Sequence, residues 1–156
     1  MTVPTDYNKV SFIIDFALSE PLNTIAVVTS KKQIIFWEAN YTQKLIKSSK
    51  LDVLQTGIWY LPLHKMWVTA GDDFNIRTWI FTPSMSNGDN KRFKLNHDKM
   101  LKAHKKKIMD IVELTAPRLV ASASLDGKIK LWDLTDNEPR LLTELRDPQN
   151  CERGVR

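Results

Sequence analysis

The sequence predicts an all-β protein built from three repeated units of short antiparallel strands. Three tryptophans each close a short strand-like run, and 42 and 53 residues separate them. These are Trp37, Trp79 and Trp132. A proline precedes each tryptophan by 15 to 17 residues, where a turn would fall. The prolines are Pro21, Pro62 and Pro117. Proline favours turns because it lacks an N–H and fixes one backbone dihedral. No helical periodicity competes with this pattern, since turn signals interrupt the chain about every ten residues.

The first unit is expected at residues 10–48, after a lead-in of residues 1–9. Its strands are predicted over 10–16, 24–29 and 33–37. The turn before the third of these strands carries Lys31, where the other two units have an aspartate. The first unit is therefore the most degenerate of the three.

The second unit is expected at residues 51–101. Strands are predicted over 57–61, 65–70 and 75–81, and Asp73 precedes Trp79 by six positions. A turn-rich polar tract follows at residues 83–90. Such a composition is typical of surface loops. We therefore expect residues 82–98 to form a loop inserted before or within the fourth strand of this unit.

The third unit is expected at residues 104–145 and has the most complete pattern. Asp126 precedes Trp132 by six positions, as Asp73 precedes Trp79. Residues 140–145 predict the fourth strand, and residues 146–156 are interpreted as the start of a further unit. The middle strands are apolar runs without strict alternation, which is typical of strands covered on both faces.

The third unit resembles a complete WD repeat, one blade of a β-propeller. The resemblance rests on Ala103-His104, on Asp126, and on the Trp132-Asp133 pair 28 positions after the histidine. It implies an all-β WD-repeat β-propeller, of which this chain holds about three four-stranded blades of a probable seven. Either a longer chain holds the remaining blades or another chain completes the ring. We favour the longer chain, because the sequence ends inside a repeat.

In WD repeats, a histidine, a serine or threonine, an aspartate and a tryptophan form a hydrogen-bonded tetrad. The indole N–H only donates, the carboxylate only accepts, and the hydroxyl and imidazole do both. The resemblance assigns the tetrad of the third unit to His104, Ser122, Asp126 and Trp132, with Ser124 as the alternative serine. In the second unit it assigns Thr69, Asp73 and Trp79, while Leu51 takes the approximate place of the histidine.

We interpret these residues as structural, and we expect no enzymatic activity, cofactor or metal. No Gly-x-Ser-x-Gly elbow surrounds Ser122. His64, His97 and His104 lack zinc-type spacing, and the aspartate-containing turns lack the other ligands of a calcium loop. Trp59 and Trp67 could anchor a partner, but we favour a packing role for tryptophans within short strands.

The net charge of +5 is concentrated in residues 91–107, which hold eight lysines and arginines against one aspartate. In propellers of the family that the chain resembles, connections between blades emerge on the face where partners bind. The candidate partner-binding residues are Lys99, Lys102, Lys105, Lys106 and Lys107. An acidic protein surface is the favoured partner. Nucleic acid is disfavoured, because the segment offers one stacking aromatic, Phe93, and little arginine. The alternative is a solvated loop.

We expect a non-catalytic protein–protein interaction scaffold within a large assembly. The alternative is a module that binds nucleic acid or acidic surfaces through Lys91–Lys107. The ending Cys151–Arg156 and the divergent early units resemble large axonemal WD-repeat proteins of cilia and flagella, some of which carry EF-hand modules. That resemblance implies microtubule-associated axonemal partners and a location in the cytoskeleton, such as the ciliary axoneme.

The sequence predicts a cytoplasmic protein without a membrane segment. The N-terminus has no basic cluster before an apolar run, so it does not resemble a signal peptide. Its apolar runs are far shorter than the roughly 18 residues of a membrane span. The single cysteine, Cys151, cannot form an internal disulfide, which favours a reducing compartment.

Overall fold

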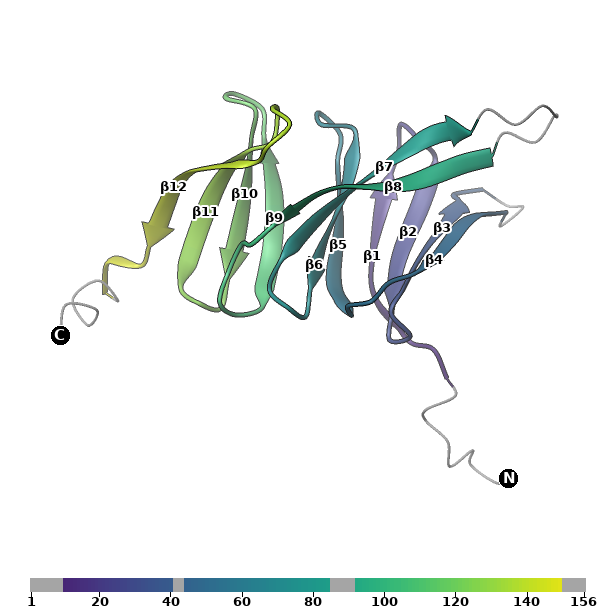
Figure 1. Ribbon diagram of the computed structural model, residues 1–156, viewed down its shortest axis with the longest axis horizontal. Coiled ribbons are helices and arrows are strands. Elements are labelled where there is room, and N and C mark those ends of the chain that lie inside the picture. Colours follow the sequence, from purple (N-terminus) through teal and green to yellow (C-terminus); the bar gives the residue numbers. More distant parts are fainter. Residues whose placement is uncertain (1–9, 41–43, 85–91, 150–156) are drawn as a thin grey trace, which may run out of the picture.

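The computed structural model of the protein describes residues 10–40, 44–84 and 92–149. Within these ranges, twelve strands form three four-stranded antiparallel sheets, which stand side by side along the long axis of the molecule (Figure 1). In each sheet the strands follow chain order, so each sheet is a simple meander. Three meanders packed face to face are three blades of a β-propeller, and the predicted fold class is confirmed.

Each blade is defined by its four strands. Blade 1 contains β1 (Ile13–Ser19), β2 (Thr24–Thr29), β3 (Gln33–Glu38) and β4 (Leu45–Lys50). Blade 2 contains β5 (Gln55–Leu61), β6 (Met66–Gly71), β7 (Ile76–Ser84) and β8 (Arg92–Leu101). Blade 3 contains β9 (Ile108–Leu114), β10 (Leu119–Ser124), β11 (Lys128–Asp133) and β12 (Arg140–Arg146).

Turn chemistry sets where the strands end. Pro21, Pro62 and Pro117 lie in the turns between the first and second strands of their blades. The turns between the second and third strands share another feature, a residue with positive φ shortly before the third strand. This residue is Lys32 (57°) in blade 1, Phe74 (64°) in blade 2 and Gly127 (80°) in blade 3. Only glycine adopts this conformation without steric cost.

The tract at residues 82–98 differs from the expected inserted loop. β7 continues to Ser84, and β8 begins at Arg92 and pairs with it. The strands extend because Phe81 and Leu95 pack against blade 1, where the Phe81 ring meets Phe36 edge-on at 4.5 Å between centroids. The polar turn signals of residues 85–90 lie outside the described residues.

Two apolar clusters hold the blades together. Between blades 1 and 2, Ala26, Val28, Ile34 and Phe36 pack against Ile58, Trp67 and Trp79. Between blades 2 and 3, Val68, Ala70 and Ile76 belong to one cluster with Ile108, Ile111, Val120 and Trp132. Blade 2 is therefore covered on both faces, which explains the apolar run Met66–Gly71, whose six residues are all buried. Trp67 is a core residue and Trp59 packs beside the core.

Candidate functional site

The tetrad residues of blade 3 form a continuous chain of hydrogen bonds. Trp132 Nε1 donates to Ser122 Oγ at 2.9 Å, and Ser122 Oγ lies 2.8 Å from His104 Nε2. His104 Nδ1 lies 2.9 Å from Asp126 Oδ2. The Asp126 carboxylate only accepts, so His104 Nδ1 carries a proton and donates to it. In the neutral imidazole Nε2 is then the acceptor, and the Ser122 hydroxyl donates to it.

Neighbouring strands and turns bring these four side chains together. Ser122 lies on β10, and Trp132 lies on β11, two residues away in the register. His104 comes from the β8–β9 connection and Asp126 from the β10–β11 turn. Asp126 also accepts the backbone N–H groups of Lys105 and Lys128, each at 3.1 Å, so it anchors that connection to the turn.

Ser124, the alternative serine, has a different role. It lies at the end of β10, where the pairing with β9 becomes irregular. Its hydroxyl donates to the carbonyl of Lys106 at 3.0 Å and accepts the backbone N–H of Asp126 at 3.1 Å. Ser124 therefore shapes the turn, and Ser122 is the tetrad serine.

Burial determines the charge states of the tetrad. Burial lowers the pKa of His104 below its usual value, although the hydrogen bond to Asp126 acts in the opposite direction. Burial alone would raise the pKa of Asp126, but the N–H of Lys105 and the His104 imidazole outweigh it, and the pKa is lowered. The site therefore holds a neutral imidazole beside a carboxylate at neutral pH. Because Ser122 and the His104 side chain are 0% exposed, no substrate reaches them.

The lowered pKa of His104 predicts a loss of stability in mild acid. The unfolded chain binds a proton at His104 near its usual pKa of 6.5, whereas the folded protein binds it only at lower pH. The contribution of His104 to folding is thus complete above pH 6.5 and decreases as the pH falls toward the folded pKa. Thermal unfolding followed by circular dichroism between about pH 7.5 and 5 should show a falling Tm. The His104→Gln variant should show a shallower decline, and parallel profiles would contradict the assignment.

Blade 2 retains only half of this arrangement. Trp79 Nε1 donates to Thr69 Oγ1 at 2.9 Å, as in blade 3. Leu51 occupies the histidine position, because its N–H bonds to the carbonyl of Lys32 as the N–H of His104 bonds to that of Phe74. Blade 2 therefore has no imidazole to connect Thr69 to the turn aspartate.

The expected tetrad role of Asp73 is corrected by the structure. Asp73 Oδ1 accepts Arg77 Nη1 at 3.0 Å and Asp73 Oδ2 accepts Arg77 Nη2 at 2.6 Å, and Asn75 binds the same carboxylate. The hydrogen bond from Arg77 lowers the pKa of Asp73. Without a histidine at residue 51, the guanidinium on β7 is the donor that reaches this carboxylate, and the pair lies partly in solvent.

Three carboxylates on the first strands of blades 1 and 3, which the sequence analysis missed, bind residues of blade 2. Asp15 on β1 accepts the N–H of Ile58 at 3.0 Å, and Asp110 on β9 accepts Trp59 Nε1 at 3.1 Å. Glu113 on β9 accepts the N–H groups of Leu63 and His64 at 3.0 and 2.9 Å and pairs with His64 Nδ1. We call Asp15, Asp110 and Glu113 the inter-blade carboxylates. The sequence signal that could have identified them is an acidic residue within an apolar, strand-like run.

The candidate partner-binding lysines do not form one group. Lys99 lies on β8, with its ammonium 3.2 Å from Asp98 Oδ2 and 3.4 Å from the carbonyl oxygen of Leu134. Its side chain is 13% exposed, so the expectation that it faces a partner is corrected. β8 passes beside the end of β11, and the lysine bridges the two blades. Lys102, Lys105, Lys106 and Lys107 are exposed in the β8–β9 connection.

The described ranges hold no group of three or more histidine, cysteine, aspartate or glutamate side chains placed to bind a metal ion. Among the same residues, no helix has the length and apolar character needed to span a membrane.

Comparisons with known proteins place these observations in a family context. The family model described as WD domain, G-beta repeat matches residues 96–133, the segment that contains the complete tetrad. The chain is also similar to the β-propeller domain of Cps50 (Swd1) from Myceliophteria thermophila, with a TM-score of 0.69 at 16% identity. The fold is a partial WD β-propeller.

The similarity covers 88% of this chain and 44% of the Cps50 chain, so this chain spans less than half of that propeller. At this level of identity the likeness concerns the fold. No curated protein matches the sequence.

Proposed function

We propose that the chain is a non-catalytic protein–protein interaction scaffold in a multi-subunit assembly. This proposal rests on the structural role of the tetrad. Ser122, His104 and Asp126 are the residue types of a hydrolase, yet their functional atoms bond to one another and to Trp132 in the interior. They stabilise a blade, so the exposed loops and blade faces are the surfaces available for function.

We also propose that further blades cover the outer faces of blades 1 and 3. Ala123 pairs with Ile129 in blade 3 as Ala70 pairs with Ile76 in blade 2. Ile76 is 1% exposed because blade 3 covers it, whereas Ile129 is 43% exposed. Blade 3 thus presents the kind of surface that blade 2 uses to bind a blade. Contiguous apolar surface of this kind marks an interface.

For the assembly itself, we propose the ciliary axoneme, with microtubule-associated proteins as partners. The support is the resemblance of the early blades and of residues 151–156 to axonemal WD-repeat proteins, and those last residues lie outside the described ranges. Immunofluorescence of the tagged full-length protein tests this location. Signal along the microtubule doublets is expected, and exclusion from cilia in ciliated cells would contradict it.

The scaffold proposal is tested by the mass and composition of the native complex. The tagged full-length protein, isolated from its own cells at physiological salt, should sediment with stoichiometric partners at a mass well above its own. Chemical cross-linking before lysis guards against dissociation. Sedimentation as the free chain, with no cross-linked partner, would refute the proposal.

A further inference from the structure

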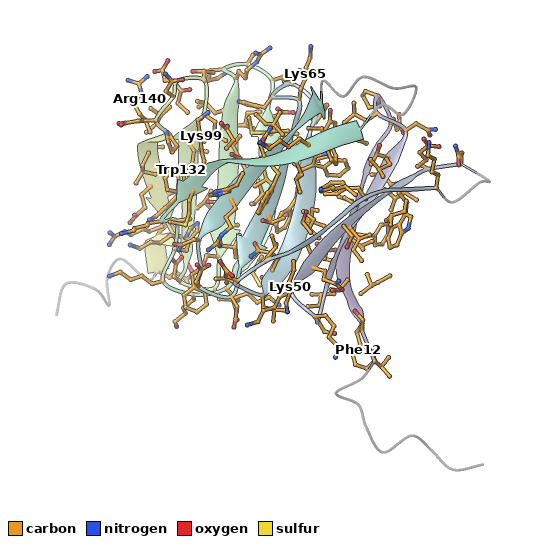
Figure 2. All side chains as sticks on the ribbon, turned by 45° about the vertical axis from the view of Figure 1, so that its right-hand side comes forward. Phe12, Lys50, Lys65, Lys99, Trp132 and Arg140 are labelled. Carbon is orange, nitrogen blue, oxygen red and sulfur yellow. The ribbon has the colours of Figure 1, made fainter. Side chains whose placement is uncertain are left out.

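The meander topology gathers two kinds of connection at one end of every blade. These are the turn between the second and third strands, and the connection from the fourth strand to the next blade. Backbone hydrogen bonds join them: Leu51 to Lys32, Asp72 to Leu54, and Leu125 to Lys107. We call this the connection end. It is the lower edge in Figure 1, and Lys50 marks it in Figure 2, with Lys65 at the opposite end.

Exposed lysines are concentrated at the connection end. Among the described residues they are Lys31, Lys32, Lys50, Lys102, Lys105, Lys106 and Lys107. Two of the acidic side chains at this end face inward or are already paired: Asp126 is 8% exposed against His104, and Asp73 is paired with Arg77. Asp52, Asp72 and Asp147 are exposed carboxylates at the same end. The net positive field at this end attracts acidic ligands over about a Debye length.

The opposite end has a different balance of charge. Among the described side chains, its exposed cations are Lys44, Lys65, Lys94, Arg118 and Arg140. Glu20, Asp136 and Glu138 are exposed at the same end, and Arg140 contacts Asp133 and Asp136 at 3.3 and 3.5 Å. Among the described side chains, exposed lysines are therefore more numerous at the connection end than at the opposite end, so the charge is not spread evenly over the surface.

The β8–β9 connection that carries four of the lysines is held in place by its backbone. The N–H of Lys105 bonds to Asp126, the carbonyl of Lys106 accepts the hydroxyl of Ser124, and the carbonyl of Lys107 accepts the N–H of Leu125. All three bonds lead to the β10–β11 turn. A partner therefore meets lysines on a fixed backbone, which lowers the entropic cost of binding.

An apolar residue accompanies these lysines. Leu125 in the β10–β11 turn is 59% exposed and bonds through its N–H to Lys107. Sequence-independent nucleic-acid sites pair cations with aromatic rings that stack on bases. An aliphatic side chain beside lysine ammonium groups suits instead a protein segment that carries carboxylates and an apolar side chain.

We infer that the connection end of blade 3 docks an acidic protein segment. Its carboxylates meet Lys102, Lys105, Lys106 and Lys107, and its apolar side chain packs on Leu125. The inference rests on the proposed scaffold function and specifies the chemistry of one partner.

The first test is zero-length carbodiimide cross-linking of the native assembly, read by mass spectrometry. The reagent joins a lysine amine directly to a carboxylate in contact with it. Cross-links from Lys102 and Lys105–Lys107 to partner glutamates or aspartates are expected. Cross-links to partners only from Lys44 or Lys65 would overturn the inference.

The second test compares two charge-matched variants of the full-length protein. The partner that cross-linking identifies is then co-purified without cross-linker. Lys105→Gln/Lys106→Gln/Lys107→Gln should lower its recovery by about tenfold, because each exposed ion pair contributes up to roughly 1 kcal/mol. The control, Lys44→Gln/Lys65→Gln/Arg118→Gln, should recover it like the wild type. Equal recovery by both variants refutes the docking surface and leaves the scaffold intact, whereas absence of partners from the wild type refutes the scaffold. Loss of the partner on nuclease treatment would show nucleic acid as the ligand instead.

Discussion

Replacing Glu113 with alanine is expected to lower the free energy of unfolding by about 3 kcal/mol, because it leaves several hydrogen-bond donors at a blade junction without their acceptor. The Glu113 side chain is 8% exposed, and the His64 side chain with which it pairs is 4% exposed. The same carboxylate accepts the N–H groups of Leu63 and His64. Alanine leaves these donors without an acceptor at the junction of blades 2 and 3. Equilibrium denaturation in urea, followed by tryptophan fluorescence, measures the change.

Two further variants separate the lost contacts from a general effect of removing a glutamate. Glu138→Ala changes an exposed carboxylate at the same end of the blades and should alter stability by less than about 0.5 kcal/mol. Glu113→Gln keeps an acceptor oxygen of similar size but removes the charge, so its cost should be intermediate. If Glu113→Ala unfolds at the same urea concentration as Glu138→Ala, the contact between Glu113 and the β5–β6 turn contributes nothing.

The large effect expected at Glu113 follows from how blades are joined. Apolar packing supplies most of the attraction between two sheets, but it is non-directional and tolerates sliding. Hydrogen bonds from a carboxylate to specific backbone N–H groups have a fixed geometry. Asp15 contributes such a bond between blades 1 and 2, and Glu113 contributes two between blades 2 and 3. The inter-blade carboxylates therefore set the register of the blades.

The blade positions could be predicted because their signals are local. A proline in the first turn and a tryptophan at the end of the third strand recur in each unit, and both act within one meander. The tetrad of blade 3 could be assigned because residues 103–133 resemble a WD repeat, in which these four residue types have complementary donors and acceptors. The choice between Ser122 and Ser124 needed the structure, because the irregular pairing at the end of β10 redirects Ser124 toward the turn.

The remaining site features depend on contacts between distant residues. Glu113 is 49 positions from His64, and nothing in either local sequence indicates that they meet. Lys99 resembles its neighbours in the lysine-rich segment, but strand β8 places it against Asp98 and the Leu134 carbonyl. The length of the β7–β8 hairpin likewise depends on the contact of Phe81 with Phe36 in another blade. The composition of residues 82–98 could not reveal this contact.

The two turn aspartates provide the sharpest comparison, because each lies six residues before its tryptophan. Asp126→Ala should destabilise the protein by about 1–3 kcal/mol, since it leaves the buried His104 imidazole without its partner. The N–H groups of Lys105 and Lys128 lose their acceptor as well. Asp73→Ala removes an ion pair in which Asp73 is 31% exposed, so its cost should stay near 0.2–1 kcal/mol.

Urea denaturation of both variants, with Asp72→Ala as an exposed neighbour, tests this difference. The expected order of destabilisation is Asp126→Ala, then Asp73→Ala, then Asp72→Ala. Equal losses at Asp126 and Asp73 would mean that the sequence position alone determines the role of a turn aspartate. A larger loss at Asp126 would mean that its contacts do, since Asp126 binds the His104 imidazole and the Lys105 N–H, whereas Asp73 binds Arg77. On that argument, the contribution of a turn aspartate to the stability of its blade depends on a second residue. That residue is the one that the connection leading into the blade places beside the aspartate.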